Sequence, residues 1–121
     1  MQTRRRLLMQ EAKRKHNYLN GVGWTDGYFI SDRGTYSSHD KGHYSDLVTV
    51  VPSNSYELAG YSESSPLWDR IHGYDANGQW LRQIEKLDWI GAFSDVIDIP
   101  ADCYYIRIST EKATQISMYD A

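Results

Sequence analysis

Three stretches of the chain decide its fold: HYSDLVTVVPSNSYELAGY (43–61), DRIHGYDANGQWLRQI (69–84) and FSDVIDIPADCYYIRIST (93–110). In each of them, two runs rich in Val, Ile, Tyr, Trp or Thr flank a short turn that contains Pro, Asn, Asp, Ser or Gly. Such runs suit a pleated, half-buried surface, and such turns reverse the chain direction. The sequence therefore predicts three consecutive strand–turn–strand units.

Further strands are expected on either side of these units, at WTDGYFIS (24–31) and QISMYDA (115–121), with the last strand pairing beside the first. The polar segments 32–46, 62–69 and 85–92 are expected to be surface loops. No segment after Gly23 sustains a helical period, so the prediction is all-β: an antiparallel, jelly-roll-like β-sandwich of seven or eight strands over residues 21–121.

Alternation along residues 104–110 predicts which side chains reach the core. Tyr104, Ile106 and Ile108 should share one buried face, with Arg107 on the other, because successive side chains of a strand point to opposite faces. Around the Asn77-Gly78 turn, Tyr74 and Trp80 are expected to form a cross-strand pair.

The composition favours a recognition surface and limits cysteine chemistry. Aromatic residues make up 13% of the 121 residues, and ten of them are Tyr and four are Trp, whose polar edges suit a recognition surface as well as a core. Cys103 is the one cysteine, so an intrachain disulfide and a cysteine-based zinc site are excluded, and it is expected to act as a small core hydrophobe. With no apolar run of about 20 residues and no signal-peptide pattern, synthesis in a cytoplasm without membrane insertion is expected.

A basic arm precedes an acidic body. Residues 1–20 contain six Lys or Arg and one Glu, a net charge of +5, whereas residues 21–121 contain seven Lys or Arg and fifteen Asp or Glu, a net charge of −8. The arm, helical or extended, could bind nucleic acid, lie on an anionic membrane, remain a disordered leader or dock on another subunit. The acidic body disfavours nucleic acid. We therefore expect docking, on a second copy of this chain among other partners, through Arg4, Arg5, Arg6, Leu7 and Leu8.

Catalytic and metal-binding patterns are weak, so no enzyme is predicted. Asp95 with Asp98, or Asp69 with Asp75, could pair as glycosidase carboxylates, but acidic residues are common on solvated sheet faces. There is no G-x-S-x-G motif, no phosphate-binding glycine loop and no metal spacing among the histidines. The many Asp residues are compatible with a structural calcium ion, although no EF-hand pattern selects its ligands.

Aromatic residues in the expected loops are the better candidates for ligand binding. A sugar can stack its apolar face on an aromatic ring while neighbouring polar groups take its hydroxyls. The candidate residues are Trp68, Trp89, Tyr36 and Tyr44, with Arg70 and Asp88 as the polar neighbours of the tryptophans. Trp24, which opens the first strand, is expected in the core.

Several motifs, taken in their order along the chain, resemble those of a known family of domains. These motifs are GWTDGYFIS (23–31), LVTVVPSNSYELAGY (47–61), GYDANGQWL (73–81) and IPAD followed by YIRIS (99–109). This series resembles the small jelly-roll, carbohydrate-binding-module-like domains in structural proteins of tailed bacteriophages and prophages, over about residues 23–119. RRRLLMQ (4–10) is similar to a short leader of virion proteins.

The resemblance implies a place on the virion, in the tail or baseplate, after synthesis in the host cytoplasm. It implies a non-enzymatic structural module that attaches to saccharide on a bacterial surface. The alternative is a purely architectural virion or assembly protein, anchored to other subunits by its arm. The resemblance supplies no binding residues.

Overall fold

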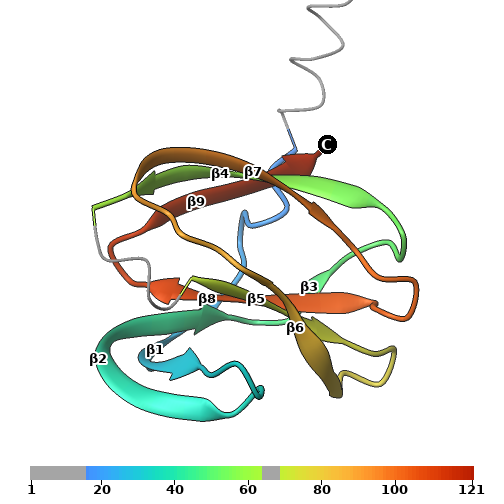
Figure 1. The fold of residues 1–121 in the computed structure, drawn as a ribbon, viewed down its shortest axis with the longest axis horizontal. Helices are drawn as coiled ribbons and strands as arrows, with labels where there is room; N and C mark the ends of the chain where they lie inside the picture. The colour runs from blue at the N-terminus through green and yellow to red at the C-terminus, as the bar shows by residue number, and fades with distance from the viewer. Residues whose placement is uncertain (1–15, 64–68) are drawn as a thin grey trace, which may run out of the picture.

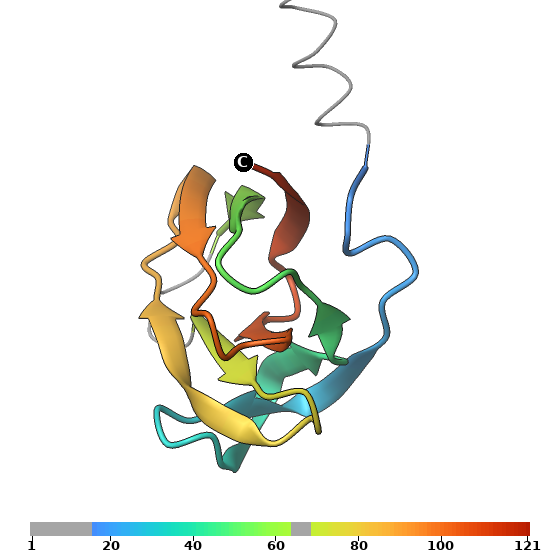
Figure 2. The ribbon, with the colours of Figure 1, turned by 90° about the vertical axis from the view of Figure 1, so that its right-hand side faces the viewer.

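The computed structural model describes residues 16–63 and 69–121, which form two antiparallel sheets packed face to face (Figures 1 and 2). The strands in chain order are β1 (Trp24–Ile30), β2 (Tyr36–Ser45), β3 (Val48–Thr49), β4 (Ser55–Ser62), β5 (Arg70–Tyr74), β6 (Trp80–Lys86), β7 (Gly91–Asp98), β8 (Tyr105–Glu111) and β9 (Gln115–Asp120). One sheet has the order β1-β2-β8-β5-β6, with β3 also paired to β8, and the other has the order β7-β4-β9. The described residues contain no helix, so the predicted all-β sandwich is confirmed, but it has nine strands where seven or eight were predicted.

The chain follows the predicted hairpins closely at the β5–β6 turn. The Asp75 carboxylate accepts hydrogen bonds from the backbone N–H groups of Asn77 and Gln79, and Gly78 adopts φ = +77°. A left-handed φ suits glycine because no Cβ clashes there. Tyr74 and Trp80 lie opposite each other across this hairpin, as predicted.

The first expected loop is wrong, because residues 36–45 form a ten-residue strand, β2. The pairing of β2 with β1 is interrupted: Asp26 lies opposite His43, whereas Tyr28 lies opposite Ser38. A step of two residues along β1 therefore corresponds to a step of five residues along β2. This bulge bends β2 sharply, and the β1–β2 hairpin curls beneath the layer of β8 and β5 in Figure 1.

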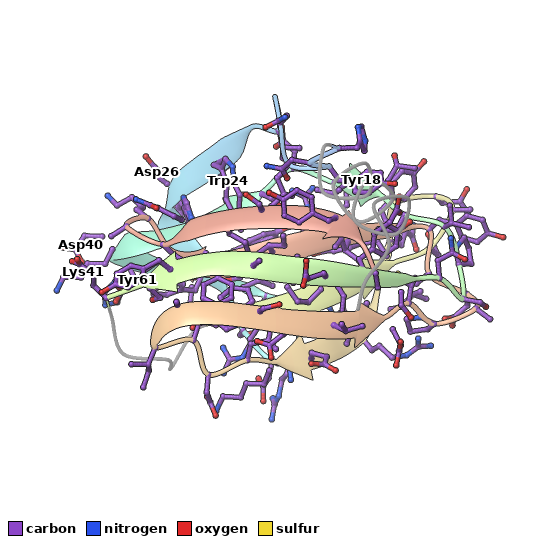
Figure 3. All side chains as sticks on the ribbon, turned by 90° about the horizontal axis from the view of Figure 1, so that it is seen from above. Tyr18, Trp24, Asp26, Asp40, Lys41 and Tyr61 are labelled. Carbon is purple, nitrogen blue, oxygen red and sulfur yellow. The ribbon has the colours of Figure 1, made fainter. Side chains whose placement is uncertain are left out.

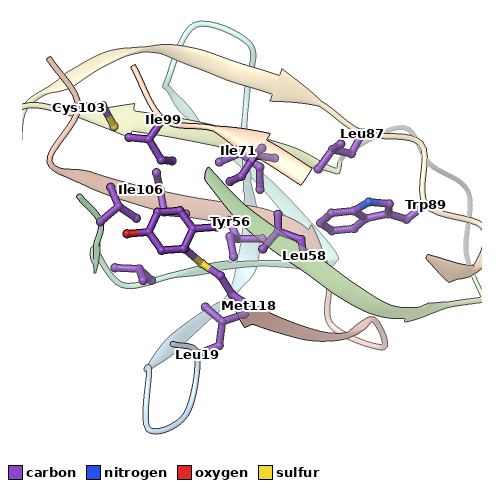
Figure 4. Close-up of a cluster of buried hydrophobic side chains, with 14 residues drawn as sticks. Leu19, Tyr56, Leu58, Ile71, Leu87, Trp89, Ile99, Cys103, Ile106 and Met118 are labelled. Atoms are coloured by element: carbon purple, nitrogen blue, oxygen red, sulfur yellow. The ribbon is translucent and has the colours of Figure 1, made fainter. Parts of the chain in front are cut away.

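The core lies between the sheets (Figure 4). Ile106 and Ile108 of β8 are fully buried, as predicted, and Cys103 is buried with its thiol pKa raised by desolvation. The prediction for Tyr104 is wrong, since this side chain is 45% exposed. It precedes β8, which begins at Tyr105, and so escapes the strand alternation. Trp24 is partly buried against the core, as predicted.

The segment before β1 packs on the body. Tyr18 N–H donates to the Met118 carbonyl of β9, the Tyr18 hydroxyl donates to Asp120, and Leu19 is buried. The hydrogen bond to Asp120 is the main cause that raises the pKa of Tyr18 to about 12. Part of the segment expected as arm thus contacts β9. In contrast to the prediction, β9 pairs with β4 and not with β1.

Arg4, Arg5, Arg6, Leu7 and Leu8 lie outside the described residues. Within the described ranges, no helix has the length and apolarity that crossing a bilayer requires.

Candidate functional site: a tyrosine–arginine cluster

Four side chains gather on the outer face of the six-stranded sheet, and we call them the Tyr–Arg cluster: Tyr36, Tyr44, Tyr74 and Arg107. The β5–β8 register places His72 opposite Arg107 and Gly73 opposite the inward-facing Ile106. Tyr74 and Arg107 therefore point away from the core, because inward and outward side chains alternate. Tyr44, opposite Ser109 of β8, lies on the same face.

Arg107 lies between two tyrosine rings. Its guanidinium carbon is 5.5 Å from the ring centroid of Tyr44 and 5.5 Å from that of Tyr74. Its Nη1 donates to the Ser45 carbonyl at 3.0 Å. Stacking of a guanidinium on aromatic faces is favourable and restricts the long side chain to one arrangement. The cluster is therefore held in place before any ligand arrives.

The bend in β2 brings Tyr36 and Tyr44 together, although they are eight residues apart. Their ring centroids are 4.8 Å apart and the rings are tilted by 41°. Tyr36 is 49% exposed and Tyr44 is half-buried, so this pair presents an accessible aromatic surface. Tyr74 beneath this pair is buried. Desolvation is the main cause that raises the pKa of Tyr74, followed by the charge interaction with Tyr36, whereas the charge of Arg107 lowers it.

Trp80 and the β1–β2 turn support the cluster from the side. A Cβ added to Gly34 would lie 2.5 Å from the Trp80 indole, so the turn backbone sits directly on this ring. The indole N–H of Trp80 donates to Nδ1 of His72 at 3.0 Å. His72 is fully buried, and desolvation, followed by the charge of Arg70, lowers its pKa from 6.5 to about 4. The imidazole is therefore neutral at pH 7 and acts as an acceptor.

Some of the residues predicted to bind a ligand lie at the cluster, and others do not. Tyr36 and Tyr44 meet, and Arg70 lies on the same sheet face, paired with Ser109. Trp89 is a wrong prediction: it is 1% exposed, stacks on Phe93 at 4.2 Å and belongs to the core (Figure 4). Asp88 is exposed in the β6–β7 connection, next to a buried tryptophan, and Trp68 lies outside the described residues.

Sequence reasoning missed Tyr74, Trp80 and Arg107 as members of one surface. The signal for Arg107 was present, because the alternation of residues 104–110 places it on the outward face. The partners that would meet it there come from β2 and β5, and no local pattern pairs these strands with β8.

The four carboxylates considered as catalytic pairs accept hydrogen bonds from protein groups: Asp69, Asp75, Asp95 and Asp98. Asp69, expected on a solvated face, is buried instead, and its carboxylate accepts from the Thr110 hydroxyl at 2.5 Å and from the Trp89 N–H at 3.2 Å. Burial raises the pKa of Asp69. Asp95 accepts from the Trp89 indole N–H at 2.7 Å. Both carboxylates therefore hold Trp89 in the core. In residues 16–63 and 69–121, no three His, Cys, Asp or Glu side chains converge as metal ligands would.

Comparison of the chain with models of protein families, with curated proteins and with solved structures gave no match.

Proposed function

We propose that this protein is a non-catalytic saccharide-binding module of the jelly-roll type, and that the Tyr–Arg cluster is its binding surface. The observation that carries the proposal is the pair of tyrosine rings of Tyr36 and Tyr44, 4.8 Å apart, of which Tyr36 is exposed, beside a fixed arginine. A sugar has an apolar face of C–H groups that packs on aromatic rings, and tyrosine combines such a ring with a hydroxyl that can bond the sugar's hydroxyls.

The arrangement suits weak and reversible binding. Because the rings and the guanidinium are already ordered by one another, little side-chain entropy is lost when a ligand binds. A small, open site of this kind favours dissociation constants from about 1 mM to tens of μM, or roughly −4 to −7 kcal/mol. Several copies on one particle would raise the overall affinity without new contacts.

The setting of this module rests on the resemblance in sequence to phage structural proteins. The proposal is a virion protein, in the tail or baseplate, that attaches to saccharide on the surface of the bacterial host. A homo-oligomer with other virion subunits as neighbours would supply the several copies.

A glycan array with the purified full chain tests the proposal, followed by titration of each hit. Tyr36→Ala and Tyr44→Ala should each weaken binding at least tenfold, because each removes one stacking ring. Tyr61→Ala is the matched control: Tyr61 is also an exposed tyrosine, but it lies on β4 of the opposite sheet (Figure 3). Equal loss in all three variants, or no glycan bound by the wild type, would contradict the proposal.

The architectural alternative is favoured by a different surface. The outer face of β7-β4-β9 exposes Val96 and Tyr61, and Glu57, Asp98 and Asp120 lie towards one end of the same sheet. His16 is close to that end, because Tyr18 bonds Met118 and Asp120 of β9. This acidic and apolar face complements the basic and apolar arm of a neighbouring copy.

Sedimentation of the full chain and of a chain lacking residues 1–15 tests this alternative. The deletion leaves the contacts of Tyr18 and Leu19 in place, so that folding and assembly are separated. A native mass that is identical for both chains, at low and high salt, would contradict docking by the arm.

A further inference from the structure

Arg107 carries a charge that the described protein does not neutralise. Its one hydrogen bond to a described residue runs from Nη1 to the Ser45 carbonyl, and its buried Nε has no partner in the part of the chain that the structure describes. No carboxylate of the described residues lies within ion-pair distance of the Arg107 guanidinium. Among the described arginines, Arg82 has a carboxylate partner, Asp102, at 2.6 Å. A partly buried cation that gains no counter-charge costs stability.

A second cation lies beside it on the same face. In the β5–β8 register Arg70 pairs with Ser109 and Arg107 pairs with His72, so the two arginines are diagonal neighbours on adjacent strands. The Nε of Arg70 is also buried without a partner among the described residues. His72, between the two on β5, adds no negative charge, since it is a neutral imidazole held by Trp80.

Burial distinguishes this pair from the other five cations of the body, which are exposed: Arg33, Lys41, Arg82, Lys86 and Lys112. Residues 21–121 carry a net charge of −8, so carboxylates are available in excess to pair with the seven cations of the body. Arg82 is paired with Asp102, whereas the partly buried Arg70 and Arg107 have no carboxylate partner in the described ranges. A guanidinium presents its donors in a planar fork that matches a carboxylate or a phosphate.

We propose that the Tyr–Arg cluster binds an acidic saccharide, in which a carboxylate or phosphate group lies against the guanidinium of Arg107 while a sugar ring stacks on Tyr36 and Tyr44. This inference rests on the proposed function and names its ligand class. Stacking on the tyrosines supplies affinity for any sugar with an apolar face, and the arginines select among sugars by charge.

Two pairs of probes, each an acidic sugar with its neutral counterpart, test the proposal with the full chain by titration calorimetry or ligand-observed NMR. Trigalacturonate is compared with galactotriose for the carboxylate, and galactose 6-phosphate with galactose for the phosphate. At least one acidic probe should bind tenfold or more tightly than its neutral partner. Raising the salt concentration from 0.05 to 0.5 M should weaken that acidic probe several-fold and leave the neutral probe nearly unchanged, since salt screens charge interactions. The probe pair in which the acidic sugar binds more tightly than the neutral one shows whether the anion is a carboxylate or a phosphate.

Matched variants locate the effect. Arg107→Gln should remove the tenfold advantage, and Arg107→Lys should retain only part of it, because lysine keeps the charge but loses the planar fork. Arg82→Gln changes the net charge equally on a guanidinium already paired with Asp102, and it should leave the advantage intact. Melting temperatures of all variants establish that they are folded; if Arg107→Gln unfolds, the salt dependence of the wild type and the Arg107→Lys result decide.

The contradicting results are distinct for the two proposals. Equal binding of acidic and neutral probes, or an advantage that survives Arg107→Gln, overturns the acidic-ligand inference and leaves saccharide binding standing. Failure of every probe and of the glycan array to bind overturns both. Binding of acetate or inorganic phosphate as tightly as the sugars, with no loss in Tyr36→Ala, would show an anion site without saccharide recognition and would also overturn the inference.

Discussion

Trp89→Ala should destabilise the protein strongly, because its indole is a central part of the core. The side chain is 1% exposed, stacks on Phe93 with an interplanar angle of 5° and donates to Asp95 at 2.7 Å. A tryptophan buries up to about 250 Å², which corresponds to an upper limit of roughly 6 kcal/mol at ~25 cal/mol per Å². Truncations of buried aromatic residues to alanine cost about 3–5 kcal/mol, since part of the cavity collapses. We expect about 4 kcal/mol.

Urea unfolding followed by far-UV circular dichroism measures this loss as a shift of the midpoint at constant slope. Trp89→Phe is the control: it keeps an aromatic ring on Phe93 and removes the N–H donor. Asp95 is only half-buried and can bond water instead, so the control should cost about 1 kcal/mol. A loss below 1 kcal/mol for Trp89→Ala would refute the core assignment. Loss of saccharide binding by a folded Trp89→Phe would show that this residue contacts the ligand.

Three further predictions concern the core, the cluster's support and pH. Ile106→Ala should cost about 2–4 kcal/mol in the same urea assay, because this side chain is fully buried on β8; a cost under half a kcal/mol would contradict its place. Gly34→Ala should lower the melting temperature and weaken glycan binding, because φ is +77° and the new Cβ would strike Trp80; unchanged values would refute the seating of this turn on the indole. His72 has a pKa of about 4 when folded against 6.5 when unfolded, so acid protonates the unfolded state first. The stability from neutral His72 is complete above pH 6.5 and falls by up to about 3 kcal/mol as the pH drops to 4. Comparing unfolding curves of the wild type and His72→Gln at pH 7 and pH 4.5 checks this, and an equal loss in both proteins would contradict it.

The sequence predicted the sandwich because its strands carry local signals. In residues 93–110 the alternation and the turn at Pro100 are strong enough to place Ile97, Ile99, Ile106 and Ile108 in the core without any knowledge of their partners. β2 was missed for a physical reason: residues 36–41 lie on an outer layer, and polar side chains there give no alternation to detect. Their strand conformation comes from pairing with β1, which is a tertiary property.

The cluster could be predicted only in part. Tyr36 and Tyr44 were candidates because they are aromatic residues in an expected loop. The contact between their rings depends on the bulge that turns β2 back on itself. Arg107 joins them from a strand 63 residues further along the chain, and pairing at that range has no local signature. Trp89 shows the reverse error. Its polar neighbour Asp88 suggested exposure, whereas the alternation of buried Leu87 and Trp89 with exposed Asp88 and Ile90 is a period of two that could have placed the indole inside.

The central claim, that the outer face of the six-stranded sheet binds saccharide, is tested most directly by ¹H–¹⁵N NMR of the full chain during titration with the best ligand from the glycan array. Shift changes should concentrate on the backbone amides of Tyr36, Tyr44, Tyr74 and Arg107 and saturate together, while those of Tyr61, Trp89 and Val96 stay unchanged. Changes confined to β4, β7 and β9, or spread over the molecule without saturation, would contradict the claim.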